Sequence, residues 1–306
     1  MLKKLKIITM ILIIASIIVG CQAVEEEFET KMGDEPNINI RFEDESVESI
    51  ALEEYVAGVV AGEMKPAWPT NAYAAQAIKA RTFTMKHMEG VDDNTISARH
   101  EEAQAYKPEN ITDVIREAVE MTRGQVAVYD GTYINAWFHS SAAGRTTSAQ
   151  AGLAFKEGEP PYVKSVESPD DLAPEDIQNW DIEISKAQVL EALRETGEEG
   201  DEILELNILE QDDTGRITQI EIVHNRGSKQ LHGAEFRTVI GPDNLKSTMV
   251  ETIEDRGESF GFIGSGWGHG VGMSQWGAKK LAQEGESPED IIKYYFEGVE
   301  IEKRWN

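Results

Sequence analysis

The sequence has a single cysteine, few basic residues and no long apolar run among its 306 residues. One cysteine excludes an intramolecular disulfide and a metal site made of several thiolates. The 29 Lys and Arg residues stand against 56 Asp and Glu, giving a formal net charge of -27. This balance argues against nucleic-acid binding, which needs a basic face, and is typical of a solvated acidic surface. The protein must therefore fold on its hydrophobic core alone.

The N-terminus has the pattern of a targeting segment. Lys3, Lys4 and Lys6 precede residues 7–20, which carry no charge and are mostly Ile, Leu, Met and Val. A short apolar run behind a positive start is typical of a secretory signal. The run is shorter than the roughly 20 residues of a membrane-spanning helix, so residues 1–20 are predicted to be a signal peptide.

The signal ends in Ile18-Val19-Gly20-Cys21, which resembles a bacterial lipobox. In this interpretation Cys21 becomes the lipid-modified first residue of a lipoprotein. The alternative is an uncleaved signal anchor with an incidental cysteine. Both interpretations place the rest of the chain outside the cytoplasm. The predicted location is the extracellular, outer face of the bacterial cytoplasmic membrane.

The remaining chain is predicted to have an α+β fold of mixed helices and antiparallel hairpins. Residues 21–46 are polar and acidic and indicate a tether with one strand at 38–42, and residues 47–303 indicate the folded unit. Hydrophobic periodicity and helix-start signals predict helices from about residue 49 to before Pro66, and at about 71–87, 114–122, 185–194, 275–283 and from Ser287. Alternation and turn residues predict hairpins at 125–138 and 203–224, and prolines indicate a long loop at 150–180.

Glu63 occupies an unusual place on the first predicted helix. It lies three and four positions after Val60 and Val59, so it points towards the apolar face. A carboxyl group there has its charged form disfavoured, and a protonated acid is what glycosidic cleavage requires. The alternative is a helix-border glutamate paired with Lys65 or Lys79.

Two further segments contain candidate functional residues. Residues 264–272 hold five glycines around Trp267 and His269, which indicates tight turns or close backbone approach to a ligand. His269 could bind substrate, ligate a metal or fix the loop. His139-Ser140 ends a predicted strand, but adjacent strand residues point to opposite faces, which disfavours a serine hydrolase.

Several motifs together cover nearly the whole chain after the tether. They are residues 52–64 with the Glu63-Met64 pair, 74–82, Gln104-Ala105-Tyr106, 138–146, Phe236-Arg237 and 266–278. In this order the motifs resemble those of the SpoIID/LytB family of sporulation and cell-wall proteins. The resemblance implies a SpoIID-type ectodomain with a glycan-binding groove, and makes residues 47–303 a catalytic domain.

The resemblance implies a peptidoglycan lytic transglycosylase that cleaves the MurNAc–GlcNAc bond, preferably in strands stripped of stem peptides. Glu63 would protonate the leaving oxygen and then act as base on the MurNAc 6-hydroxyl, closing an anhydro ring. The candidates for lining or shaping the glycan groove are Gln76, Arg81, Tyr106, His139, Ser140, Arg237, His269, Ser274 and Gln275.

The sequence departs from the family pattern at one point. Some members carry cysteines beside the segment matching His139 and bind zinc there. This chain has Ser141, Ala142 and Ala143 instead, so a thiolate zinc site is excluded and no metal or cofactor is predicted. A weaker site of His139 and carboxylates is conceivable but is not the prediction.

Two other functions remain open at this point. A non-catalytic glycan-binding module could stimulate a cell-wall amidase, as LytB-type members are thought to do, and a plain hydrolase would leave reducing ends. The presence of Glu63 favours the transglycosylase. The predicted partners are peptidoglycan glycan strands, the membrane through the lipid anchor and a cell-wall amidase, with no nucleic acid.

Overall fold

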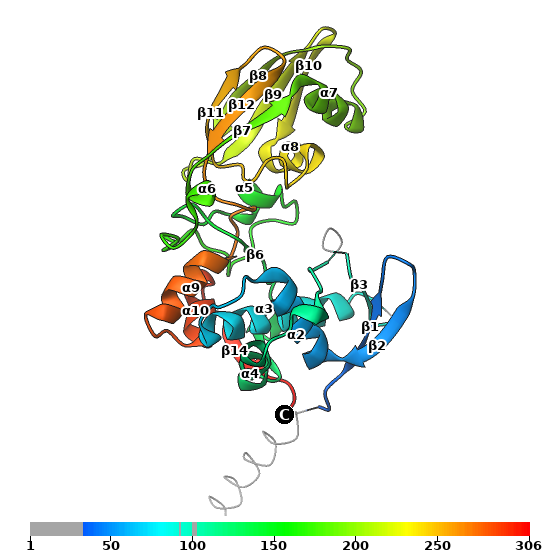
Figure 1. Cartoon of the computed structure of the whole chain (residues 1–306), viewed down its shortest axis with the longest axis vertical. Helices are drawn as coiled ribbons and strands as arrows, with labels where there is room; N and C mark the ends of the chain where they lie inside the picture. The colour runs from blue at the N-terminus through cyan, green and yellow to red at the C-terminus, as the bar shows by residue number, and fades with distance from the viewer. Residues whose placement is uncertain (1–32, 92, 100–102) are drawn as a thin grey trace, which may run out of the picture.

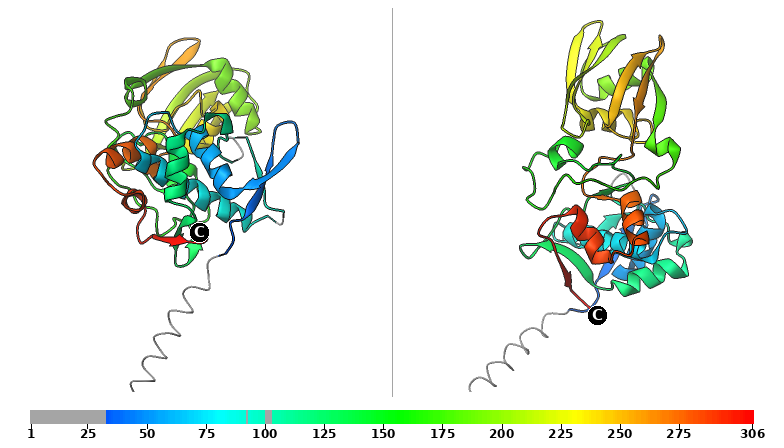
Figure 2. Two further views of the ribbon diagram at one scale, coloured as in Figure 1. Left: turned by 60° about the horizontal axis from the view of Figure 1, so that its bottom comes forward. Right: turned by 90° about the vertical axis from the view of Figure 1, so that its left-hand side faces the viewer.

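The computed structural model describes residues 33–91, 93–99 and 103–306. The chain forms a mainly helical lobe and a mainly β lobe, joined by a layer of loops and short elements (Figures 1 and 2). The predicted signal peptide, Cys21 and the first part of the predicted tether lie outside the described residues. In the described ranges, no helix is long and apolar enough to cross a membrane.

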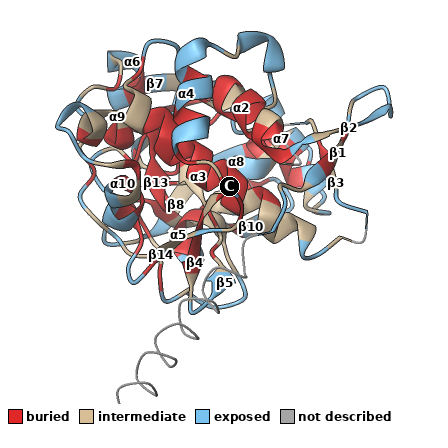
Figure 3. Cartoon of the chain, turned by 90° about the horizontal axis from the view of Figure 1, so that it is seen from below, coloured by how far each residue is buried: buried red, intermediate tan, exposed pale blue. Residues whose placement is uncertain are grey.

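The α lobe is built around one central helix. Its helices are α2 (Leu52–Glu63), α3 (Thr70–Met88), the 3-10 turn η1 (Pro108–Asn110), α4 (Asp113–Met121), α9 (Gln275–Gln283) and α10 (Pro288–Tyr295). Helix α3 is buried along most of its length because its alanines let α2, α4, α9 and α10 approach closely. Figure 3 shows the buried surfaces of α2 and α3 at the centre of this lobe.

Two small sheets flank these helices. One has the order β2-β1-β3, with β1 (Asn37–Arg41), β2 (Val47–Ala51) and β3 (Thr95–Ser97); the other has the order β14-β4-β5, with β4 (Gln125–Tyr129), β5 (Thr132–Tyr133) and β14 (Glu300–Lys303). In β1, Ile38 and Ile40 are buried in the α-lobe core, since alternate residues of the strand face the helices.

The β lobe has a hydrophobic core of its own. Its elements are α6 (Glu175–Gln178) at the entry, β7 (Trp180–Ser185), α7 (Lys186–Glu195), β8 (Ile203–Gln211), β9 (Ile217–His224), β10 (Gly227–His232), α8 (Gly233–Ile240), β11 (Val250–Asp255) and β12 (Ser259–Gly264). The strands form two antiparallel sheets, β10-β9-β8 and β11-β12-β7. Ile220, Ile222 and Phe262 are fully buried in the core of this lobe.

The layer between the lobes brings distant segments together. It contains β6 (Phe138–His139), α5 (Ala149–Leu153) and β13 (Met273–Ser274). Strands β6 and β13 pair in parallel, with Phe138 opposite Met273 and His139 opposite Ser274. The predicted His139 segment and the end of the glycine-rich loop are therefore neighbours.

The α+β prediction is confirmed, and several predicted boundaries shift. Helix α2 begins at Leu52, not near residue 49, because residues 47–51 pair with β1. The folded part consequently begins within the predicted tether. The predicted strand at 132–138 stops at Tyr133, since the chain there leaves the sheet for the layer between the lobes. Residues 47–303 form two lobes with separate cores, and strands β7, β10 and β12 were not predicted.

Candidate active site

A groove of about 540 Å³ runs between the α lobe and the layer that joins it to the β lobe. It takes residues from α2, the end of the α2–α3 connection, β6, α8, the glycine-rich loop and α9. The lining residues are Glu63, Lys65, Trp68, Ala105, Phe138, His139, Ser140, Ile177, Arg237, Trp267, Gly268, His269, Gln275 and Trp276. Six residues predicted from the sequence therefore meet in one groove: Glu63, His139, Ser140, Arg237, His269 and Gln275.

Glu63 is the last residue of α2 and is half-buried at the groove. Its Oε1 accepts a hydrogen bond from the backbone N–H of Ala105 at 2.7 Å, which fixes the orientation of the carboxyl group. The Gln275 amide donates to the Glu63 main-chain oxygen at 3.3 Å, linking α9 to the end of α2. Among the described residues that line the groove, Glu63 is the only acid.

The glycine-rich loop forms one wall because its glycines adopt a conformation that other residues rarely take. Gly266, Gly268, Gly270 and Gly272 all have positive φ, between 70° and 106°. A Cβ on Gly268 would lie 2.6 Å from the Cβ of the β6 histidine, so glycine is also required for the close approach. The prediction of tight turns is confirmed, and close approach of this backbone to a ligand stays a prediction.

His139 and His269 lie together at the wall, with ring centroids 5.4 Å apart. Burial lowers the pKa of His269 to about 3, and burial lowers the pKa of His139 well below its ordinary value. Both rings are therefore neutral near pH 7. His269 Nδ1 accepts from the Val271 N–H at 3.0 Å, so this neutral ring carries its proton on Nε2.

His139 is held by the same residue. Its Nδ1 lies 3.2 Å from the Val271 main-chain oxygen and must donate to it, which makes Nε2 the acceptor. Nε2 is buried without a hydrogen-bond partner among the described residues, so no bond joins His139 to the Ser140 hydroxyl. No group of three His, Cys, Asp or Glu side chains that could hold a metal ion occurs within the described ranges.

Arg237 enters the groove from α8 of the β lobe. Its Nε donates to the main-chain oxygen of Leu245 at 2.9 Å and its Nη2 to that of Pro242 at 3.2 Å. Burial lowers the pKa of Arg237 to about 10, while Asp243 opposes the shift. The guanidinium remains charged at neutral pH and is held in place by the turn that follows its helix.

Arg81 and Gln76 lie inside the α lobe and do not line the groove. Arg81 is fully buried, pairs with Glu53 at 2.6 Å and donates to the main-chain oxygen of Gln125 at 2.8 Å. Gln76 is also fully buried, and its amide atoms have no hydrogen-bond partner among the described residues. Both side chains face the core because α3 is surrounded by other elements.

Tyr106 and Ser274 support the groove without lining it. Tyr106 packs against Gly58 of α2, where an added Cβ would come within 2.2 Å of its ring. Ser274 is fully buried and caps α9, and its hydroxyl donates to Asp170 at 2.7 Å. This cap fixes the start of α9, whose first residue is Gln275.

Asp170 is a buried carboxylate that was not among the residues predicted from the sequence. Its Oδ2 accepts from the Ser141 hydroxyl at 2.9 Å and from the Ala142 N–H, while Oδ1 accepts from the hydroxyls of Ser168 at 2.8 Å and Ser274 at 2.7 Å. These bonds hold the end of β6 against the start of α9. Asp170 gave no signal because it stands in a proline-rich stretch without periodicity.

Aromatic side chains that were not predicted complete the groove. Trp68 and Trp276 pack with ring centroids 4.8 Å apart, and Trp267 lies on the glycine-rich loop. The chain has six tryptophans, so half of them line this one groove. Apolar walls with a few convergent polar groups are typical of ligand sites, and the two tryptophans within the motif segment 266–278 were a usable signal.

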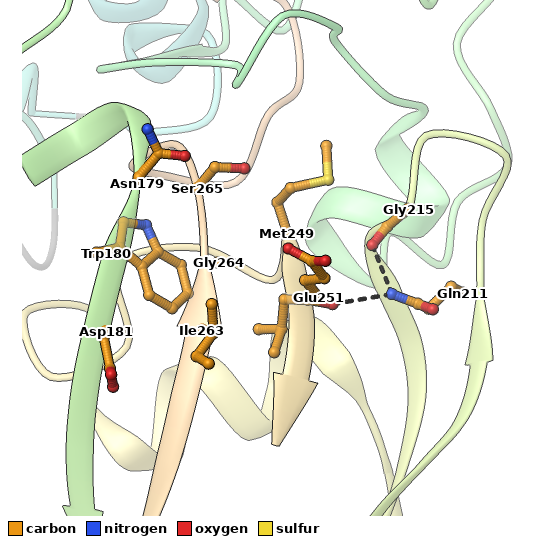
Figure 4. A pocket seen from close by; sticks show the side chains of 11 residues that line it. Asn179, Trp180, Asp181, Gln211, Gly215, Met249, Glu251, Ile263, Gly264 and Ser265 are labelled. Atoms are coloured by element: carbon orange, nitrogen blue, oxygen red, sulfur yellow. Dashed lines mark hydrogen bonds between the residues drawn. The ribbon is translucent and has the colours of Figure 1, made fainter. Parts of the chain in front are cut away.

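A second groove of about 560 Å³ lies in the β lobe, beside β7, β11 and β12 (Figure 4). Its lining carboxylates are Asp181, which pairs with Arg256 at 2.9 Å, and Glu251. The side-chain amide of Gln211 donates to main-chain oxygens, including that of Gly215 at 2.8 Å. None of the described residues that line it is a half-buried acid fixed by a backbone amide, so the Glu63 groove is the better candidate for chemistry.

Two family models match the chain, one in the α lobe and one over the β lobe. A family model described as stage II sporulation protein (SpoIID) matches residues 43–129, which contain α2, α3 and Glu63. A second model, described as a domain of unknown function (DUF8618), matches residues 163–272, which contain the whole β lobe. The boundary between the two matches falls in the layer that joins the lobes.

Individual relatives extend the match over most of the chain. The chain is 33% identical over 284 residues to stage II sporulation protein D of Bacillus amyloliquefaciens, covering 85% of this chain and 77% of that protein. It is 32% identical to stage II sporulation protein D of Bacillus subtilis with the same coverage. An amidase enhancer of Bacillus subtilis is 27% identical over 80% of this chain and 40% of its own length. The chain therefore belongs to the SpoIID family, as its motifs predicted.

Proposed function

We propose that this protein is a lytic transglycosylase that cleaves the MurNAc–GlcNAc bond of peptidoglycan glycan strands, with Glu63 as its general acid and base. Membership of the SpoIID family and similarity to an amidase enhancer support a role in sporulation and at the cell wall. The observation that carries the proposal is the oriented, half-buried carboxyl group of Glu63 in a groove lined by three tryptophans.

One carboxyl group can serve both steps of this reaction. In the first step, the bond between MurNAc C1 and the bridging oxygen breaks as Glu63 gives its proton to that oxygen. In the second, the MurNAc 6-hydroxyl oxygen bonds to C1 and its proton returns to Glu63, leaving a 1,6-anhydro ring. No water is consumed and the acid is regenerated.

The groove's composition favours this reaction over hydrolysis. Glycoside hydrolases typically use two carboxyl groups, about 5–9.5 Å apart, on either side of the scissile bond. Among the described residues that line this groove, Glu63 is the only one with a carboxyl group. The neutral His139 and His269 and the charged Arg237 would hydrogen bond to the sugars without replacing a second acid.

Product analysis tests the proposal directly. Purified protein is incubated with denuded glycan strands, and the products are examined by mass spectrometry for anhydro-MurNAc ends. Wild type should produce them, and Glu63→Gln should lose at least about a hundredfold in rate. Glu54→Gln, which changes a partly exposed side chain at the start of the same helix, should keep its rate. Reducing ends would identify a plain hydrolase, and full activity of Glu63→Gln would show that another residue is the acid.

A second candidate function is a non-catalytic glycan-binding stimulator of a cell-wall amidase. The observation in its favour is the 27% identity to an amidase enhancer. In that case wild type would bind glycan strands, yield no anhydro ends and accelerate an amidase in a coupled assay. Glu63→Gln would then stimulate the amidase as well as wild type does.

We also propose that the chain is a lipoprotein on the outer face of the cytoplasmic membrane, anchored through Cys21. The lipobox-like sequence supports this location. Mass spectrometry of the mature N-terminus should find a lipid-modified Cys21. An intact Met1 would show an uncleaved signal anchor instead.

A further inference from the structure

Two lysines, one lining the groove and the other beside it on α9, have no carboxylate partner in the part of the chain that the structure describes. Lys65 lines the groove and is exposed, and Lys279 lies next to it on α9. Neither forms an ion pair among the described residues, although the chain has a formal net charge of -27. The neighbouring Lys280, in contrast, pairs with Asp171 and Glu284, each at 3.5 Å. We refer to Lys65 and Lys279 as the lysine pair.

The lysine pair is held together by two tryptophan rings. Lys279 Nζ lies 4.6 Å from the ring centroid of Trp276 and 5.1 Å from that of Trp68. Lys65 Nζ lies 5.4 Å from the Trp276 centroid. Attraction to the ring faces therefore holds both cations near Trp276, which lines the groove.

This arrangement has an electrostatic cost that an anion would relieve. Burial and the charge of Lys65 both lower the pKa of Lys279. Two like charges held close together at a partly exposed site favour the approach of a negatively charged group. The lysine pair is thus suited to binding an anion, although the molecule as a whole is acidic.

We propose that Lys65, assisted by the charge of Lys279, binds the free lactyl carboxylate of a MurNAc unit that carries no stem peptide. The proposal rests on the proposed function, since it takes the groove to bind glycan. A stem peptide converts this carboxylate into a neutral amide, so the lysine pair distinguishes stripped strands from peptide-bearing ones. The lactyl group belongs to the sugar whose C1–O bond would break, and Lys65 is two residues from Glu63 in the same groove.

Arg237 is the other cation lining the groove, but its environment differs. It enters from the β lobe, and two of its donor nitrogens are already bonded to the main-chain oxygens of Leu245 and Pro242. Lys65 is exposed and its ammonium group makes no hydrogen bond or ion pair among the described residues, so it can turn to a ligand. This difference assigns the carboxylate to Lys65 and not to Arg237.

Binding to two matched polymers tests the assignment without turnover. One polymer is denuded glycan; the other is the same glycan with its lactyl carboxylates converted to primary amides. In the Glu63→Gln background, the carboxylate polymer should bind about tenfold more tightly than the amide polymer, the value of one charge-assisted hydrogen bond. Adding Lys65→Gln and Lys279→Gln should reduce this ratio to about twofold or less, since the charge-assisted bond is then lost.

Control variants separate charge recognition from changes in folding or total charge. Lys303→Gln removes one positive charge from the exposed strand β14 and should keep the tenfold ratio. Lys65→Arg should retain most of it, and high salt should weaken it because the site is exposed.

Three outcomes would overturn the assignment: equal binding of the two polymers by the Glu63→Gln protein, an unchanged ratio in the double lysine variant, or loss of the ratio in Arg237→Gln alone. The cleavage assay is read separately. If wild type forms no anhydro ends from either polymer, the proposed enzymatic function fails, while the binding ratio still decides whether the lysine pair reads the carboxylate.

Discussion

Replacing Arg81 with methionine should destabilise the protein strongly and leave glycan recognition by the folded fraction unchanged. The family motif includes Arg81, and the sequence alone makes it a candidate for the groove. In the structure its guanidinium is fully buried and bonds to Glu53 through Nη2 at 2.6 Å and Nε at 3.0 Å. Arg81→Met would leave the carboxylate buried with two other donors, the Gly124 N–H at 3.0 Å and the Trp305 indole N–H at 2.9 Å.

The expected loss follows from breaking a buried pair at one partner. Such a change costs about 3–5 kcal/mol, because an uncompensated charge remains in the core. The double variant Glu53→Gln/Arg81→Met should lose less than the sum of the two single changes, since it leaves no buried charge. Arg116→Met provides the control, because Arg116 pairs with Glu54 at the surface, and it should change the stability little.

Urea denaturation followed by tryptophan fluorescence gives the free energies, and glycan binding at a temperature where each variant is folded gives the second readout. Trp305 lies against Glu53 and reports on this part of the α lobe. If Arg81→Met kept its stability and lost glycan binding, Arg81 would contact the ligand and the structural explanation would be wrong. Loss of binding in proportion to the unfolded fraction would agree with a role in the core.

Three further expectations concern the groove's support. Gly270→Ala should lower the free energy of unfolding by ~2 kcal/mol or more, because φ is +79° and the new Cβ would lie 2.2 Å from a buried guanidinium. The control Gly257→Ala, at φ +86° in open space, should lower it by only about 1 kcal/mol. Asp170→Asn should cost about 2 kcal/mol in urea titrations, since an amide nitrogen would face hydroxyl and N–H donors, and the exposed Asp171→Asn should change little. Because burial lowers the pKa of His269 to about 3, the unfolded chain binds a proton below pH 6.5 that the folded protein does not. The stability of wild type should therefore fall from about pH 7 towards pH 3, and it should fall more steeply than that of His269→Phe, by up to about 1.4 kcal/mol per pH unit. Equal slopes of stability against pH in the two proteins would contradict this account.

Local signals in the sequence predicted much of the α lobe. Helix α3 was expected at about 71–87 and spans Thr70–Met88, and α9 spans the predicted residues. The Ser287 cap and Pro288 mark the start of α10 as expected. Such features were predictable because caps, prolines and hydrophobic spacing act over a few residues.

The β lobe was harder to predict for a physical reason. Strand β12 pairs with β7 across more than 70 residues of sequence, and β12 is the only strand that β7 pairs with among the described residues. Strand formation there depends on partners brought together by the fold, not on local propensity. The separate core of this lobe was likewise invisible in the sequence, because composition does not change at its boundaries.

The sequence by itself determined the family and the identity of the candidate acid. The Glu63-Met64 pair and the ordered motifs suffice for both, because each motif is a run of neighbouring residues that can be recognised without the fold. It also placed the glycines of the 264–272 loop, since only glycine adopts the positive φ found at four of them without strain.

Only the tertiary structure decided which of the motif residues meet at the groove. His139, Arg237 and His269 reach it from different elements, while Arg81 points into the core to pair with Glu53. Spacing along the chain cannot distinguish these cases, because the direction of a side chain relative to distant elements is set by packing. The same holds for Lys65, which became notable only when the structure placed it beside a second unpaired cation.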